Sequence, residues 1–234
     1  MSAELVLFDI DGTILRSEGA GIAAMVDAGR SLFGPRLSAE GIPIAGRLDP
    51  LIMAEILARA GVEVTREHLG AFRAAYTREL ERRLGLAETR VRIMPGVHAL
   101  IAALADHAPA SLGLLTGNFE ETGCMKLRAG GVDPAPFIFN AWGDDSPSSP
   151  PTRNDLPRMS MNRYQDARGR SLDPARVVVI GDTPHDVACA RAHGCRSLGV
   201  GTGAFAPEAL AAAGATLAVP DLSDTVAVVR WLLD

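Results

Sequence analysis

The segment ELVLFDIDGT, residues 4–13, decides the fold of this chain. Its four apolar residues, 5–8, form an unbroken run of the kind carried by a strand that is buried on both faces. Asp9 and Asp11 follow directly, and Gly12 permits a sharp turn after them. Side chains at i and i+2 of an extended segment share a face, so we expect both carboxylates to project together from the strand end. A solvated acidic turn would carry the same pattern, and this segment alone leaves the function open.

Composition narrows the class of protein. With 47% hydrophobic residues, the 234-residue chain can bury a sizeable core. Its net charge of −5 argues against a nucleic-acid partner. No apolar run reaches the roughly 20 residues that span a bilayer, and the N-terminus does not resemble a signal peptide. The three cysteines have no paired spacing. We therefore expect a cytoplasmic protein, a monomer or homodimer, with neither a membrane nor a nucleic-acid partner.

Short apolar runs alternate with longer stretches of helical periodicity along most of the chain. We expect strands at residues 4–8, 111–115, 136–139, 177–180, 196–200 and 216–219. We expect helices at residues 97–106, 120–129, 156–167, 185–193 and 207–213. Helices that alternate with continuous apolar strands are typical of a parallel sheet covered on both faces. The sequence therefore predicts an α/β fold with a doubly wound, Rossmann-like parallel sheet, whose ligands bind beyond the carboxyl ends of the strands.

One segment breaks this alternation. Residues 17–93 carry three consecutive helical patterns and no convincing strand. A simple crossover between parallel strands does not need three helices, so we expect an inserted helical cap at 17–93 and a core formed by 1–16 and 94–234. The alternative is that these helices merely cover one face of the sheet.

Two later segments also place polar side chains at expected strand ends. LLTGN, residues 114–118, delivers the Thr116 hydroxyl and the following amides to a helix start, where anions bind readily. GDTPHD, residues 181–186, places Asp182 at a strand end and Asp186 at a helix start. Asp9, Asp11 and Asp182 would repel one another at one sheet edge unless a cation lay among them. Oxygen ligands with water and a phosphate favour Mg²⁺.

These three motifs, in this order and with a helical insertion after the first, resemble the haloacid dehalogenase (HAD) superfamily, specifically its phosphatases with a C1-type cap such as phosphoglycolate phosphatase. The resemblance covers nearly the whole chain. It implies that Asp9 attacks phosphorus to form an aspartyl-phosphate, and that Asp11 protonates the leaving oxygen and then activates water. It also implies a small phosphorylated metabolite as the substrate.

The resemblance implies the remaining ligands as well. Mg²⁺ would be held by Asp9, the backbone carbonyl of Asp11, and Asp182, with Asp186 in support. Thr116 and the amides of Gly117 and Asn118 would bind the transferred phosphoryl group. In the cap, AGRLD resembles a segment that faces the substrate, so Arg47 is an expected substrate contact, whereas Asp49 is expected to cap a helix.

The family usually supplies a lysine between the second and fourth motifs, and this chain departs from that pattern. Its single lysine, Lys126, lies inside the helix after LLTGN, where we expect a surface position. Arg153 is the expected substitute, with Arg158 second, because a guanidinium can carry the same charge and bridge two oxygens.

Three functions therefore follow from the sequence. The main prediction is a Mg²⁺-dependent phosphatase for a small phosphomonoester. The alternatives are a sugar-phosphate mutase of the same superfamily, and a weak or inactive HAD-fold binding protein that lost turnover with its lysine.

Overall fold

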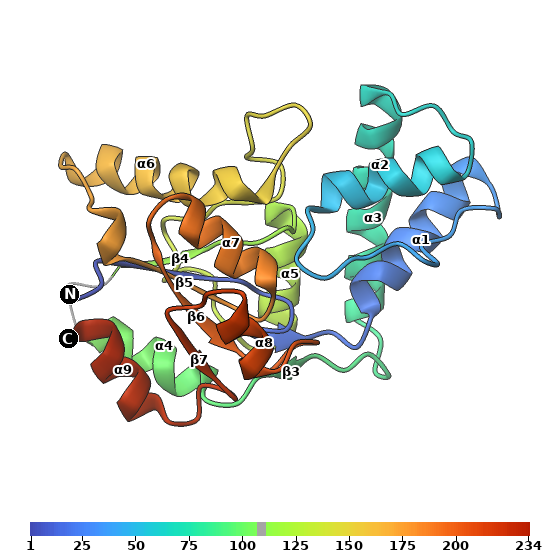
Figure 1. The fold of residues 1–234 in the computed structure, drawn as a ribbon. Coiled ribbons are helices and arrows are strands. Elements are labelled where there is room, and N and C mark those ends of the chain that lie inside the picture. The colour runs from blue at the N-terminus through green and yellow to red at the C-terminus, as the bar shows by residue number, and fades with distance from the viewer. Residues whose placement is uncertain (107–110) are drawn as a thin grey trace.

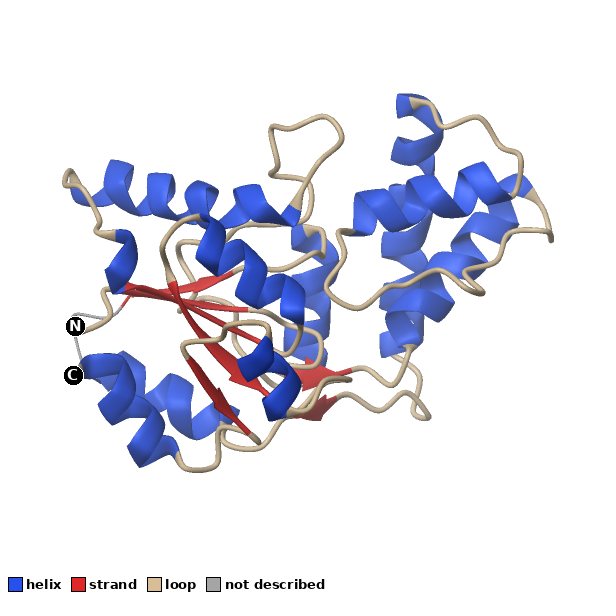
Figure 2. Ribbon diagram, in the orientation of Figure 1, coloured by secondary structure: helices blue, strands red, loops and turns tan. Residues whose placement is uncertain are grey.

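The structure, a computed structural model, describes residues 1–106 and 111–234. A parallel sheet runs through the larger part of the molecule (Figures 1 and 2), with strand order β4-β1-β5-β6-β7. The strands are β1 (Leu5–Phe8), β4 (Ser111–Leu114), β5 (Val177–Gly181), β6 (Arg196–Val200) and β7 (Leu217–Val219). The predicted doubly wound α/β fold is confirmed.

Alternate residues of the central strand face opposite layers of the core. Val6 and Phe8 of β1 pack into one cluster with apolar residues of α4 (Val97–Asp106) and α9 (Thr225–Leu233). Leu5 and Leu7 pack into the other cluster, with residues of α6 (Leu156–Arg168) and α7 (Pro184–Ala192). Helices therefore cover both faces, which explains why the strand is apolar at every position.

The remaining core elements connect these layers. They are α5 (Glu120–Ala129), η1 (Arg153–Asp155), η2 (Pro174–Arg176) and α8 (Pro207–Ala212). None of the helices in the described part of the chain combines the length and apolar character that crossing a bilayer requires.

Three helices lie together at one side of the sheet, as Figure 1 shows: α1 (Ala20–Phe33), α2 (Asp49–Arg59) and α3 (Arg66–Leu84). They share a hydrophobic core of their own, which includes Met25, Ile56 and Phe72. The α3 helix starts at Thr65, whose hydroxyl accepts a hydrogen bond from the His68 N–H and so caps the helix. This group of helices packs largely on itself.

The structure differs from the expected elements in three places. Residues 136–139 form only an isolated bridge, Leu112 with Phe137, because Pro136 has no N–H to donate to a ladder. The strands β2 (Leu15–Arg16) and β3 (Arg92–Ile93) form a short antiparallel pair where the chain enters and leaves the helical group. Helix α9 was not expected from the sequence.

Candidate active site

The three polar motifs meet because their strands are neighbours. Strand β1 lies between β4 and β5, and Phe8 is in register with both Leu114 and Ile180. The residues that follow these positions therefore leave the sheet at the same edge. This edge is also where the strand order reverses around β1, which is the usual ligand site of such sheets.

Three buried carboxylates gather at this edge. Asp9, Asp182 and Asp186 each offer an oxygen, and these oxygens lie within 4.8 Å of one another. Burial raises the pKa of Asp9 and of Asp182, and the neighbouring carboxylates raise both further. A divalent cation would relieve this repulsion, and carboxylate oxygens are the ligands that Mg²⁺ prefers. The donor set therefore fits a hard divalent cation.

The backbone at two glycines lies close to the Asp182 carboxylate. A Cβ atom at Gly12 or at Gly203 would collide with the Asp182 carboxylate, and Gly12 also has a φ of 85°. Thr13 donates a hydrogen bond of 3.2 Å to Asp182 Oδ1. The glycine of the first motif is thus required both for the turn and for space beside the acid.

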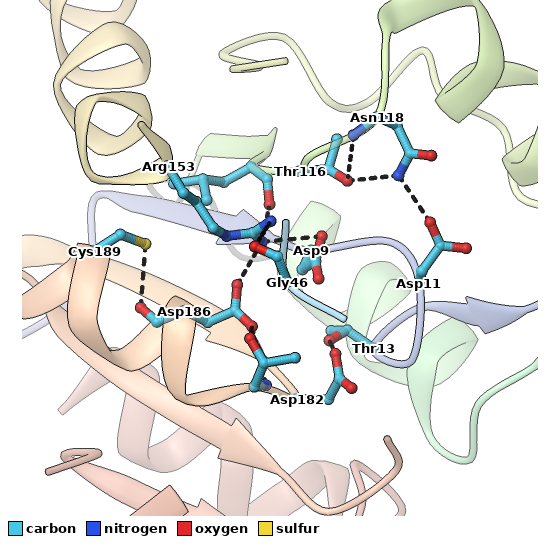
Figure 3. Close-up of polar contacts among 12 residues, drawn as sticks. Asp9, Asp11, Thr13, Gly46, Thr116, Asn118, Arg153, Asp182, Asp186 and Cys189 are labelled. Atoms are coloured by element: carbon cyan, nitrogen blue, oxygen red, sulfur yellow. Dashed lines mark hydrogen bonds and ion pairs between the residues drawn. The ribbon is translucent and has the colours of Figure 1, made fainter. Parts of the chain in front are cut away.

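Arg153 reaches the carboxylates from η1. Its Nη2 lies 3.2 Å from Asp9 Oδ1 and 2.5 Å from Asp186 Oδ1, and the side chain is buried (Figure 3). Burial alone would lower the pKa of Arg153, but Asp186 and Asp9 outweigh it, so the pKa is raised and the charge is kept. Arg158 is exposed and lines a different cavity. Of the two expected arginines, Arg153 is the one at this site.

Both carboxylate oxygens of Asp186 have protein donors. Oδ1 pairs with Arg153, while Oδ2 accepts hydrogen bonds from the backbone N–H of Thr183 at 3.0 Å and its hydroxyl at 2.7 Å. The bond from the Thr183 backbone N–H is one half of a capping box at the start of α7, and the other half is the bond from the Asp186 backbone N–H to the Thr183 hydroxyl. Asp186 therefore orients Arg153 and fixes this helix start.

The second motif forms a compact loop beside Asp9. Thr116 is fully buried, and its Oγ1 accepts a hydrogen bond of 2.7 Å from Asn118 Nδ2. The same amide nitrogen donates to Asp11 Oδ2 at 2.8 Å (Figure 3). Thr116, Gly117 and Asn118 all line the cavity above Asp9. The motif thus connects the expected phosphate-binding loop to the second acid.

Lys126 is not on the surface, and the sequence-based expectation was wrong. Its side chain is buried, and Nζ lies 2.7 Å from Asp11 Oδ2 and 2.7 Å from Asn118 Oδ1. Burial alone would lower its pKa, but Asp11 and Asp49 outweigh burial, so the pKa is raised. Lys126 lies about two turns into α5. Helical side chains lean toward the N-terminus of the helix, so the long Lys126 side chain extends back to the site.

The helical group closes over this edge. A cavity of about 380 Å³ is lined by Asp9, Asp11 and Lys126 on the sheet side and by residues of α1, α2 and α3. The start of α2 contacts the expected phosphate-binding loop directly, because the Asp49 N–H donates to the Gly117 carbonyl at 2.8 Å. A Cβ atom at Gly117 would collide with the Arg47 carbonyl.

Arg47 was expected to contact the substrate and Asp49 to cap a helix, and the structure gives each of them a different set of contacts. Arg47 lines the cavity, but its Nη1 pairs with Glu55 Oε2 at 2.7 Å. Asp49 is the first residue of α2 rather than its cap, which is Leu48. Instead, its carboxylate is buried near the backbone N–H of Phe119, its Oδ2 has no hydrogen-bond partner, and burial raises its pKa to about 7. The expected capping role of Asp49 was therefore wrong.

This arrangement can support nucleophilic chemistry at an anionic centre. It combines a buried carboxylate beside a fixed guanidinium, a second carboxylate held by an ammonium, a hydroxyl with amides, and donors for a divalent cation. Such a set is typical of hydrolases that act on phosphate or related esters.

Comparison with known proteins defines the class. The family model described as "haloacid dehalogenase-like hydrolase" matches residues 6–191, and the chain belongs to this family. The resemblance seen in the motifs is thereby confirmed.

The individual proteins that this chain is similar to share only a low sequence identity with it. The "Probable phosphatase IndB" of Dickeya dadantii is 24% identical over 98% of this chain and 94% of its own length. Two crystal structures share the fold. CbbY from Rhodobacter sphaeroides in complex with phosphate has a TM-score of 0.71 at 21% identity, over 95% of this chain and 96% of that one. A predicted phosphoglycolate phosphatase from Haemophilus somnus has a TM-score of 0.70 at 19% identity, over 97% and 98%.

Proposed function

We propose that the protein is a Mg²⁺-dependent phosphatase that hydrolyses a small phosphomonoester through an aspartyl-phosphate on Asp9. One observation carries this proposal. The buried Asp9 carboxylate lies beside Asp182 and 3.2 Å from the Arg153 guanidinium, in a cavity that Asp11 also lines. The phosphatase name of the curated relative supports the same reaction.

The proposed division of the chain follows the packing. Residues 1–16 and 94–234 would form the catalytic core, and residues 17–93 a cap. The separate hydrophobic core of α1, α2 and α3 supports this division, as does the β2–β3 pair at the junction. Closure of the cap over the sheet edge would exclude water from the reacting groups.

Asp9, Asp182 and the backbone carbonyl of Asp11 would hold Mg²⁺. The ion would supply positive charge to the phosphate oxygens and to the nucleophile. Asp186 supports the site through Arg153, because both of its oxygens already accept bonds from protein donors.

Arg153 takes the place of the family's usual lysine. Its contact with Asp9 keeps the carboxylate in position and offsets part of the charge that a phosphoryl group brings. Thr116, with the amides of Gly117 and Asn118, would bind the transferred phosphoryl oxygens. Attack by an Asp9 oxygen forms a bond to phosphorus while the bond from phosphorus to the leaving oxygen breaks.

Asp11 would give a proton to that leaving oxygen and later accept one from water as the acyl phosphate is hydrolysed. We propose that Lys126 positions Asp11 for both steps. Lys126 and Asn118 together hold Asp11 Oδ2, at 2.7 and 2.8 Å, which leaves Oδ1 free of these two contacts. A residue that acts through Asp11 is a positioning residue, and it was missed in the sequence.

The first experiment measures phosphate release from 4-nitrophenyl phosphate with Mg²⁺, for the wild type and for Asp9→Asn. We expect release by the wild type and none above background by the variant, with unchanged circular dichroism. Full activity of Asp9→Asn would refute the assignment of the nucleophile. The alternative of an inactive binding protein predicts no release by either protein, and also no thermal stabilisation by Mg²⁺ with beryllium fluoride.

Free thiols at Cys124, Cys189 and Cys195 agree with the proposed reducing, cytoplasmic location. The oligomeric state, monomer or homodimer, stays a prediction.

A further inference from the structure

The cap contributes a mainly apolar wall to the cavity. Six of the thirteen cap residues that line it are aliphatic or aromatic, and three more are glycines without a side chain. The six are Ile22, Met25, Ile44, Ala45, Ile52 and Tyr76. The polar side chains are those of Ser17, Glu18, Arg47 and Asp49. The phosphate-binding groups all lie on the sheet side. A bound phosphomonoester would therefore turn its leaving group toward this wall, and an apolar body would gain the most from contact with it.

Two of the cationic side chains that line the cavity are paired with carboxylates, although the buried Nε atom of Arg153 has no hydrogen-bond partner. Lys126 is paired with Asp11, and Arg153 with Asp9 and Asp186, and both cations are buried. Moving Arg153 to a second anion on the substrate would leave the carboxylates of Asp9 and Asp186 without their partner at a buried site. That loss is severe because the charge stays desolvated.

The other two cations among the described lining residues also have protein partners. Arg47 pairs with Glu55, which also pairs with Arg59, so two guanidinium groups share one carboxylate. Arg16 donates to the Gly203 carbonyl at 2.8 Å, on the loop after β6 and so on the core side of the opening. Both guanidinium groups therefore already have a protein partner, although the Gly203 carbonyl carries no net charge.

Acids line the same cavity. Asp11, Glu18 and Asp49 all line it. A second phosphate or a carboxylate on the leaving group would meet Glu18 and Asp49 on the cap side of the cavity, and like charges oppose binding. The cap side of the cavity would therefore disfavour a leaving group that carries a negative charge as well as one that is polar.

We propose that the substrate's leaving group is an uncharged alcohol with an apolar body, without a second phosphate or carboxylate. This inference rests on the proposed function, because it assumes that the scissile phosphate lies at Asp9. It also disfavours the mutase alternative, since a sugar-bisphosphate intermediate would need a second anion site in this cavity.

The test compares two esters of matched length and leaving-group chemistry, n-pentyl phosphate and 5-phosphooxypentanoate, which differ by a terminal carboxylate. We expect kcat/KM to be about tenfold or more higher for n-pentyl phosphate, as one opposed charge near a partly buried acid implies. Equal values, or a preference for the carboxylate, would overturn the inference.

A second experiment introduces a positive charge at the cap wall. Ile44 lines the cavity, whereas Val64 lies elsewhere in the cap, and both side chains are 42% exposed, so an arginine at either position should not disturb folding. We expect Ile44→Arg to raise kcat/KM for the carboxylate ester relative to the neutral ester by about tenfold, and Val64→Arg to leave this ratio unchanged. A ratio that does not move in Ile44→Arg would contradict the assigned wall.

A binding measurement with non-hydrolysable analogues tests this inference separately from the catalytic proposal. The non-hydrolysable pair pentylphosphonate and 5-phosphonopentanoate is titrated calorimetrically into the wild type with Mg²⁺. Tighter binding of pentylphosphonate without turnover of any ester would keep the leaving-group inference and refute the phosphatase. Turnover with no preference in either assay would keep the phosphatase and refute the inference.

Discussion

Lys126 Nζ lies 2.7 Å from Asp11 Oδ2 and 2.7 Å from Asn118 Oδ1, with the lysine side chain 6% exposed. The only lysine of the chain therefore pairs with Asp11, the second acid of the first motif. Arg153 pairs with Asp9, the first acid. The two acids differ in partner, and this difference supports the proposal that Asp9 attacks phosphorus and that Asp11 transfers the proton.

Replacing Lys126 should impair proton transfer selectively. We expect Lys126→Met to lower kcat for an alkyl phosphate by about 10²-fold, the usual contribution of a positioned acid, and to lower kcat for 4-nitrophenyl phosphate much less. The reason is that nitrophenolate leaves without needing a proton. The leaving-group dependence is measured across a series of esters.

Two controls accompany this variant. Arg128→Met changes an exposed neighbour on the same helix and should leave the series unchanged. Lys126→Arg keeps a donor for Asp11 and should restore part of the rate on alkyl esters. An equal loss on every ester in Lys126→Met would mean that the lysine is merely structural.

Arg153 should be needed for the first displacement. We expect Arg153→Lys to lower kcat by about 10²-fold or more for all esters, because one ammonium cannot contact Asp9 and Asp186 as a guanidinium does. Arg153→Ala would in addition lower the free energy of unfolding by about 3–5 kcal/mol, since two buried acids lose their partner. Steady-state kinetics and urea unfolding measure the two effects.

Arg158→Ala is the matched control, because Arg158 is exposed and lies outside the site. A loss of rate in Arg158→Ala with none in Arg153→Lys would reverse the assignment.

Mg²⁺ should stabilise the folded protein through Asp182. At a Mg²⁺ concentration of 100 times Kd, the gain in the free energy of unfolding is about 2.7 kcal/mol. The gain should grow as pH rises, because the raised pKa values of Asp9 and Asp182 mean that Mg²⁺ displaces protons at low pH. Thermal unfolding with and without Mg²⁺ at several pH values measures this.

Variants separate the acids in the same assay. Asp182→Asn should lose the stabilisation by Mg²⁺, while Asp186→Asn should lower stability but keep a gain from Mg²⁺. The reverse outcome would make Asp186 a principal ligand.

Asp49 should make stability depend on pH. Its folded-state pKa is about 7, whereas the same carboxyl titrates near pH 4 when unfolded. The unfolded chain loses this proton first, so the wild type loses stability as pH rises from about 4 to about 7. We expect Asp49→Asn, which cannot ionise, to gain stability relative to the wild type across this window.

The measurement is the difference in Tm between Asp49→Asn and the wild type from pH 5 to pH 8, with Asp166→Asn as the exposed control. A difference that stays constant with pH would show that Asp49 titrates normally.

Much of the fold and of the acidic edge could be predicted because both depend on local patterns. The continuous apolar run before Asp9 fixes a central parallel strand, and strands of that kind deliver their following residues to one sheet edge. Residues 136–139 show the limit of this reasoning. They are apolar, but two prolines, Pro134 and Pro136, interrupt the backbone donors that a strand needs.

The contacts that cross the boundary between cap and core could not be predicted. Lys126 lies on a polar helix, and only the packing of that helix beneath α1 and α3 buries it. A Cβ atom at Gly21 of α1 would lie 3.2 Å from Lys126 Nζ, so this glycine makes room for the lysine. Asp49 likewise meets Phe119 only through tertiary folding.

The aspartyl-phosphate is the central claim, and it can be trapped. The Asp11→Asn variant, which lacks the base for the second step, is mixed with 4-nitrophenyl phosphate and Mg²⁺, quenched in acid and digested for mass spectrometry. We expect one phosphoryl group on the peptide that contains Asp9, and none when Asp9→Asn is added to the variant. A burst of nitrophenolate with the Asp9 peptide unmodified would contradict the account.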